Sequence, residues 1–210
     1  PRTLPQELVP YAALLSEILG SMNTKKYSYG ELDNMLNIHT GGFNAYLDSY
    51  LENRNDKNLL PQFIVSSKAM NTKVNKIFEL TNEILYHSHL KDSERLKTVL
   101  ERHFARLDAR IKSNGFGYTR TRLYSYFSNT GMFDELTGGI EYYWFLNKLV
   151  KDFDQNEKQI TGQLQKTARL LFNKNNLISA VTCSDTDLPF VKTELEKFAS
   201  SLPAEPHELK

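Results

Sequence analysis

The spacing of apolar residues near the start of the chain predicts two helices. Between residues 6 and 22, leucine, isoleucine and alanine recur at the interval that places them on one face of an α-helix. A shorter helix is predicted next, because Ser28 and Glu31 have the spacing of a capping box at a helix start. Residues 40–42, Thr-Gly-Gly, then interrupt the helical pattern.

From Phe43 to Leu51 apolar and polar residues alternate, which is typical of a half-buried strand. A second strand is predicted around residues 63–65, so the two strands would form an antiparallel hairpin. The polar residues 53–58 are expected to connect them. We expect Pro61 at the start of the second strand or on an edge, because proline cannot donate a ladder hydrogen bond.

Residues 71–172 predict a series of helices, since the apolar positions keep a helical period throughout. Breaks are expected at Gly115 and Gly131, and Gly138 and Gly139 are expected to precede an aromatic-rich helix.

The end of the chain predicts a strand at residues 177–183 and a last helix capped by Asp185 or Asp187. Residues 203–210 are expected to be a flexible tail. No linker or composition shift divides the rest. The element order therefore predicts one α+β domain over residues 1–202, with an antiparallel sheet packed against several helices.

Charge argues against nucleic acid as the main partner, because 26 basic and 25 acidic residues leave a net charge of +1. Five arginines do lie close together, but Glu101 and Asp108 dilute them, and a solvated helix face is the better interpretation. A helical nucleic-acid-binding protein stays open as an alternative, to be revived by strongly salt-dependent binding. The arginines are Arg102, Arg106, Arg110, Arg120 and Arg122.

The single cysteine, Cys183, excludes an internal disulfide and permits an intracellular location, cytoplasmic or in an organelle matrix. Its place in the predicted strand suggests a buried core cysteine. No apolar run approaches the length of a membrane-spanning helix, and no signal-peptide pattern is present, so no membrane partner is expected. The chain begins without methionine, and we expect it to be a piece of a longer protein.

The histidines do not have the spacing of a metal site. His87 and His89 are two apart and would diverge on a helix. His39, His103 and His207 have no acidic or cysteine partner at ligand spacing. The sequence also lacks H-E-x-x-H and its inverse, H-x-x-E-H. We therefore expect no metal bound to this chain.

Other chemistry is equally weakly indicated. The Gly115-Phe116-Gly117 stretch lacks the third glycine of a dinucleotide fingerprint and follows a helix. No nucleophile elbow is present. The aromatic residues 142–145 are expected to pack in the core rather than line a groove. The residues alone thus predict a domain with no catalytic and no metal-binding residue, and they identify no substrate-binding residue.

Three stretches resemble a known family in the same order and with similar spacing. These are residues 40–43 (TGGF), 113–123 (SNGFGYTRTRL) and 138–146 (GGIEYYWFL). Together they resemble pitrilysin/insulinase zinc peptidases, specifically the third domain of the presequence-protease-like subfamily, in the C-terminal half of the polypeptide.

The resemblance implies a zinc metalloendopeptidase that degrades short or unfolded peptides. Such a protein has four related α+β units arranged as two halves that close around the peptide. The first unit carries H-x-x-E-H, in which two histidines bind zinc and the glutamate activates water; the fourth supplies an arginine and a tyrosine. The implied partners of this chain are the N-terminal catalytic half, the following domain and the peptide. The implied zinc belongs to the parent protein.

This sequence departs from the catalytic pattern. Aligning Gly20-Ser21 with the Gly-Ser that ends the catalytic helix places residues 11–15 where H-x-x-E-H would stand. Tyr11 and Leu15 then replace the ligands, and Leu14 replaces the general base. The prediction is a non-catalytic unit that forms part of the wall of the closed chamber. An exposed apolar face is expected where it packs against a sibling unit.

The alternative is a freestanding binding or scaffold module of the same fold without protease activity, as in core subunits of respiratory complexes. An H-x-x-E-H upstream on the same polypeptide, or on a partner chain, would distinguish the two.

Overall fold

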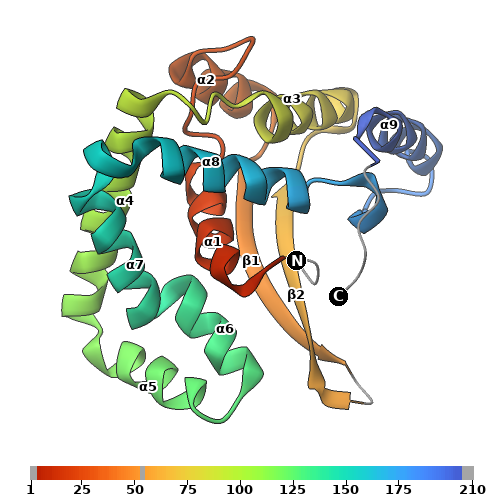
Figure 1. Cartoon of the computed structure of the whole chain (residues 1–210). Coiled ribbons are helices and arrows are strands. Elements are labelled where there is room, and N and C mark those ends of the chain that lie inside the picture. The colour runs from red at the N-terminus through yellow and green to blue at the C-terminus, as the bar shows by residue number, and fades with distance from the viewer. Residues whose placement is uncertain (1–3, 53–54, 205–210) are drawn as a thin grey trace.

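The computed structural model describes residues 4–52 and 55–204, and the side chains of 55–58 are left out of the description. A long hairpin is covered on one face by helices (Figure 1). The helices and strands are α1 (Val9–Ile18), α2 (Tyr29–His39), β1 (Phe43–Glu52), β2 (Asn55–Ser67), α3 (Val74–His87), α4 (Ser93–Ser113), α5 (Gly115–Ser125), α6 (Asn129–Gly138), α7 (Ile140–Lys151), α8 (Phe153–Leu171) and α9 (Leu188–Ser201). Single 3₁₀ turns lie at Gln6–Leu8, Asn71–Lys73 and Lys174–Asn176.

The hairpin confirms the predicted α+β class. β1 and β2 pair antiparallel, with Leu47 opposite Phe63, and the alternating residues of β1 pack on the helical core as predicted. The opposite face exposes Tyr46 and Tyr50.

The second strand differs from its prediction in length. β2 begins at Asn55, so the polar connection expected at 53–58 is wrong for residues 55–58, and residues 53–54 lie outside the described residues. Pro61 pairs with Ser49 inside β2. The proline is accommodated because each strand of a two-stranded sheet has a free edge.

The capping box predicted at the start of α2 is confirmed. The Ser28 hydroxyl accepts the Glu31 backbone N–H at 3.4 Å, and the Ser28 N–H donates to the Glu31 carboxylate at 2.9 Å. Two otherwise unpaired backbone N–H groups are thereby satisfied.

The core is built around α1, which contacts α8, β1, α6 and α4. Leu14, Leu15 and Ile18 of this helix are completely buried. They pack with leucines and isoleucines from α4 and α8, such as Leu100 and Leu164. Fully burying one such side chain contributes about 1.5–3 kcal/mol, so α1 is a packing element.

The predicted helical series is confirmed from α3 to α8, with one corrected break. Gly131 lies inside α6, and the chain turns before it, where the Ser128 hydroxyl accepts the Gly131 N–H at 2.9 Å. A Cβ at Gly131 would lie 2.5 Å from the backbone of Tyr124. This glycine therefore permits close packing of α5 and α6.

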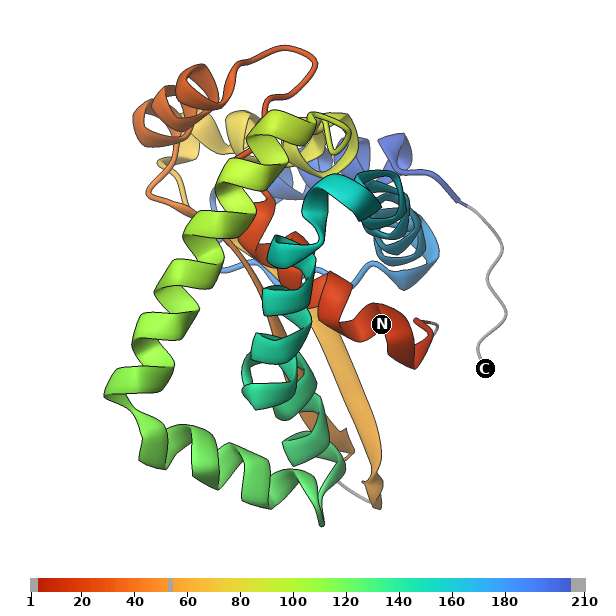
Figure 2. The same cartoon turned by 60° about the vertical axis from the view of Figure 1, so that its left-hand side comes forward.

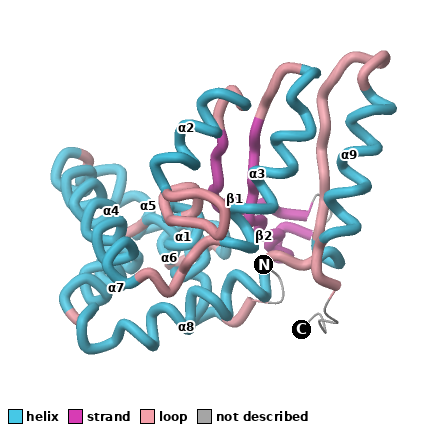
Figure 3. The backbone as a smooth tube through the Cα atoms, turned by 90° about the horizontal axis from the view of Figure 1, so that it is seen from above, coloured by secondary structure: helices cyan, strands magenta, loops and turns pink. Residues whose placement is uncertain are grey.

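The strand predicted at residues 177–183 is wrong. This segment is extended but has no strand partner among the described residues, and Ile178 is 85% exposed. Figure 3 shows it as a loop running beside α9. Cys183 is consequently exposed, which corrects the expected core cysteine. Strand propensity requires a neighbouring edge to pair with, and none is offered here.

The last helix, α9, begins after Asp187 as predicted, although this side chain does not cap the helix. It bonds to Asn71 and Ser184 instead. Most of the expected tail, residues 205–210, lies outside the described residues. No helix within the described part of the chain is long and apolar enough to cross a membrane.

Candidate functional site

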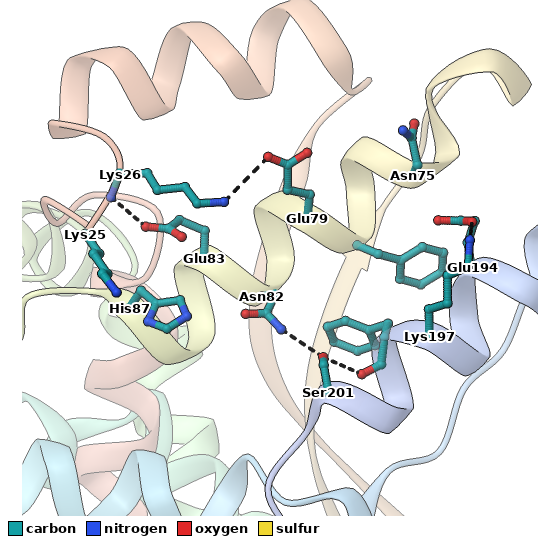
Figure 4. A pocket seen from close by; sticks show the side chains of 12 residues that line it. Lys25, Lys26, Asn75, Glu79, Asn82, Glu83, His87, Glu194, Lys197 and Ser201 are labelled. Carbon is teal, nitrogen blue, oxygen red and sulfur yellow. Dashed lines mark hydrogen bonds and ion pairs between the residues drawn. The ribbon is translucent and has the colours of Figure 1, made fainter.

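A groove of about 500 Å³ lies between α3 and α9, closed at one end by the loop that follows α1 (Figure 4). Its apolar floor is formed by Phe78 and Phe198, whose ring centroids are 5.5 Å apart. Beside them the Asn82 side chain donates to the Ser201 hydroxyl at 3.0 Å. These contacts fix α9 on α3. The groove is lined by Lys25, Lys26, Asn75, Phe78, Glu79, Asn82, Glu83, His87, Glu194, Lys197, Phe198 and Ser201.

The carboxylates of the groove are held by lysines and backbone N–H groups. Glu79 lies 2.7 Å from Lys76 and 3.8 Å from Lys26. The hydrogen bond from Lys76 lowers the pKa of Glu79. The buried Glu83 accepts the backbone N–H of Lys26 at 2.8 Å, and Glu194 lies 2.6 Å from Lys197.

This charge arrangement favours binding over catalysis. A carboxylate with a lowered pKa is a weak base at neutral pH. Lys25 and His87 lie together at the other end of the groove (Figure 4), where the Lys25 backbone N–H donates to the His87 carbonyl at 3.0 Å. The groove thus offers an apolar floor with charged and hydrogen-bonding walls, which suits a polar peptide segment.

A second cluster joins α1, α4 and α7 inside the fold. His103 is buried, with Nδ1 3.2 Å from the Glu17 carboxylate and Nε2 3.0 Å from the Tyr142 hydroxyl. Because a carboxylate only accepts, the imidazole proton belongs on Nδ1, and the tyrosine donates to Nε2. Burial raises the pKa of Tyr142. The cluster is closed to solvent on its tyrosine side, so it pins three helices together.

Glu17 gives this cluster a pH dependence. The hydrogen bond from His103, aided by the charges of His103, Arg106 and Arg110, lowers the pKa of Glu17 below its ordinary value of 4.5. A lowered pKa in the folded state contributes stability above the unfolded value and loses it as pH falls through the folded value. Glu17→Gln is therefore expected to be less stable than the wild type at neutral pH, with a gap that closes below pH 4.5. Urea unfolding across this range measures the gap, and a pH-independent gap would contradict the assignment.

A third cluster brings together two of the stretches that resemble pitrilysin-type peptidases. Arg122 of the first stretch lies 3.0 Å from Glu135 and 2.6 Å from Glu141. These carboxylates, Glu141 foremost, raise the pKa of Arg122. Glu135 also accepts the backbone N–H of Glu141 at the start of α7, at 3.0 Å. Gly139 of the other stretch is needed there, because a Cβ would lie 2.1 Å from the Glu135 carboxylate.

The sequence interpretation missed these partners. It assigned all five arginines to a solvated helix face, and four of them are indeed exposed, but Arg122 is half-buried between two carboxylates. Its four-residue spacing from Tyr126 and the proximity of Glu135 to the Gly-Gly pair were the available signals. Neither signal fixes which residues meet in space.

The residues at the position of the zinc motif do not fit a metal. Leu14 and Leu15 of α1 are completely buried in the core. Tyr11 packs edge-on against Phe145, with ring centroids 4.9 Å apart, and burial raises its pKa. A neutral tyrosine and two leucines supply neither ligand nor base for zinc.

The histidines are scattered, as their sequence spacing predicts. His87 and His89 are exposed at the end of α3, His39 ends α2, and His103 is buried in α4; His207 lies outside the described residues. Within the described ranges, no three histidine, cysteine or acidic side chains come together in a way that could hold a metal ion.

The other candidates are also placed. Gly115 and Gly117 begin α5 after the C-terminal end of α4, so they form a helix–helix connection. The aromatic run of α7 divides: Tyr142 is buried as predicted, whereas Trp144 is exposed.

Comparison with known proteins gives the family context. The family model for the associated domain of peptidase family M16, subfamily C, matches residues 2–149. "Protein HypA" of Clostridium perfringens is 31% identical over 198 residues, covering 94% of this chain and 20% of that protein. "Presequence protease 1, chloroplastic/mitochondrial" of Arabidopsis thaliana is 28% identical over 205 residues, covering 97% of this chain and 19% of that protein. The mitochondrial presequence protease of Saccharomyces cerevisiae is 25% identical over 206 residues, covering 95% and 21%.

These matches confirm the predicted resemblance to presequence-protease-like peptidases. The chain spans about a fifth of the length of these relatives.

Proposed function

This chain belongs to the peptidase-associated family of peptidase family M16, subfamily C, and from that premise we propose that it is a non-catalytic domain of a zinc metalloendopeptidase that degrades short or unfolded peptides. In the closed parent protein it forms part of the wall of the substrate chamber. One observation carries the proposal: in a chain of this family, the positions of the zinc motif hold Tyr11, Leu14 and Leu15, packed into the core.

Zinc in this proposal belongs to the catalytic half of the parent protein. When bound there, it lowers the pKa of a water molecule and generates the attacking hydroxide. The residues of this chain contribute packing and surface. Their partners are the N-terminal catalytic half, the following domain of the same polypeptide and the peptide itself, in an intracellular location, cytoplasmic or in an organelle matrix.

Two surfaces support a role in the chamber wall. The uncovered face of the hairpin exposes Tyr46 and Tyr50, and aromatic rings with a hydroxyl group make both apolar and polar contacts. The free strand edges can accept an extended peptide by backbone pairing. The groove between α3 and α9 adds a second peptide-compatible surface.

Deleting residues 1–210 from the full-length protein is expected to leave zinc bound and to abolish peptidase activity, because the chamber no longer closes around the peptide. Metal analysis gives zinc per chain, and an unstructured fluorogenic peptide reports cleavage. Ile178→Asn, at an exposed position of the same segment, serves as the control that should retain both. Retained activity after the deletion, or loss of zinc, would overturn the proposal.

The full reading frame separates this function from a freestanding binding module. An H-x-x-E-H upstream and a unit carrying arginine and tyrosine downstream support the peptidase. A frame limited to these residues, without such a partner chain, supports the binding module.

A further inference from the structure

Helix α5 presents its apolar residues to solvent instead of to the core. Phe116, Leu123 and Phe127 are 81%, 57% and 66% exposed. Their spacing of seven and then four residues places them on one side of α5 and the turn after it. The buried residue of this helix is Ser125. The usual relation of an amphipathic helix to its own core is thus inverted.

The exposed stripe is part of a larger aromatic surface. Tyr124 contacts Phe127 with ring centroids 5.7 Å apart. The Arg122 guanidinium lies 5.5 Å from the Tyr126 ring and 5.6 Å from the Trp144 ring. We call the set Phe116, Leu123, Tyr124, Tyr126, Phe127 and Trp144 the α5 apolar surface.

Part of this surface is held in place before any partner arrives. Arg122 sits between the two rings because Glu135 and Glu141 bind its guanidinium. A preorganised surface loses less side-chain entropy on binding. Its composition, aromatic residues together with arginine, is that of the energetic centres of protein interfaces.

The position and shape of α5 favour a folded partner. Figure 2 shows α5 crossing between the ends of α4 and α6 at the edge of the molecule, with no element beyond it. A convex helix face fits a groove between elements of another folded unit, as in helix-in-groove recognition. Scattered exposed apolar residues need no explanation, but a contiguous aromatic surface marks an interaction site.

Charge argues against a second copy as the occupant. Arg120 lies in the stripe between Phe116 and Leu123, and its side chain has no ion-pair partner in the described part of the chain. A symmetric pairing of two such stripes would bring like charges together. A carboxylate on the partner would instead complement Arg120.

We propose that the α5 apolar surface docks into an apolar groove, with a carboxylate opposite Arg120, on another folded unit of the same polypeptide. The inference rests on the proposed function in one respect, namely that this chain is a domain of a larger protein. The relatives support this occupant, because about four-fifths of their length lies outside the matched segment.

The test places the photo-crosslinking residue p-benzoylphenylalanine at Phe116 and, separately, at Leu123 in the full-length protein. Irradiation is expected to join both positions to residues outside 1–210, without a change in apparent chain mass. Met70 is the matched control, because it is 71% exposed and lies far from α5 in sequence. Adding Arg120→Glu is expected to lower the crosslinking yield about tenfold, since a lost interfacial charge pair costs about 1.4 kcal/mol or more.

Three outcomes would overturn the proposal: a product of doubled mass, crosslinks only to added peptide, or a yield no higher than at Met70. The first would identify a second copy, the second a substrate surface and the third a bare face. Zinc content and peptidase activity test the proposed function separately. Intramolecular crosslinks in a parent that lacks peptidase activity would leave the docking surface standing while the peptidase proposal fails.

Discussion

Replacing Gly139 by alanine is expected to destabilise the protein by about 3 kcal/mol, near the upper end for overpacking a closed site. The added Cβ would lie 2.1 Å from the Glu135 carboxylate and 2.8 Å from the Glu135 Cα. Moving the side chain alone does not relieve the second contact. Glu135 is also 1% exposed, and displacing it would separate a buried carboxylate from Arg122.

Gly138→Ala is the matched control. Nothing lies within 4 Å of a Cβ at that position, so alanine there is expected to be neutral or to stabilise by about 0.4–1 kcal/mol through the unfolded state. Urea unfolding of the two variants gives both values. Equal stability of Gly138→Ala and Gly139→Ala would show that α6 and α7 can move apart, contrary to the packing described here.

Local signals in the sequence predicted the elements whose stabilising contacts are also local. The capping box at Ser28 involves residues three apart, and alternation along β1 sets the buried face of the hairpin. The segment at 177–183 shows the limit of such signals. Its β-branched residues favour a strand, but a strand requires an edge elsewhere in the chain, and the sequence does not say whether one is available.

The candidate site depends on contacts between distant positions, and for that reason the sequence did not predict it. The groove joins Phe78 to Phe198, and Asn82 to Ser201, across more than half of the chain. Similarly, the sequence places His103 on an amphipathic helix but does not reveal that Glu17 and Tyr142 meet it there. Only the resemblance carried long-range information, because the order of its three stretches identified the family.

The same reasoning separates the two kinds of exposed aromatic residue. Helical spacing predicted the aromatic run of α7 as core, and this is confirmed for Tyr142 but wrong for Trp144. Spacing identifies a helix face but not which face meets the core. On α5 the apolar face points outward, which is understandable if its partner belongs to another unit of the polypeptide.

Tyr142→Phe is expected to lower the free energy of unfolding by about 2 kcal/mol, within the range for leaving a buried polar group without its partner. The variant keeps the ring and its packing against Phe145, but Nε2 of His103 loses the hydroxyl that lies 3.0 Å away. Water does not replace that donor readily, because both side chains are buried.

The neighbouring residue provides the control for this substitution. Tyr143→Phe removes an equivalent hydroxyl, which donates to Asp108 at 3.0 Å at a partly exposed site where water can substitute. We therefore expect Tyr143→Phe to cost clearly less than Tyr142→Phe in the same urea titration. Adding His103→Leu to Tyr142→Phe should recover much of the loss, because removing both partners leaves no unpaired buried group. Equal losses for the two tyrosines, or strict additivity of the His103 and Tyr142 substitutions, would mean that the cluster acts by packing alone.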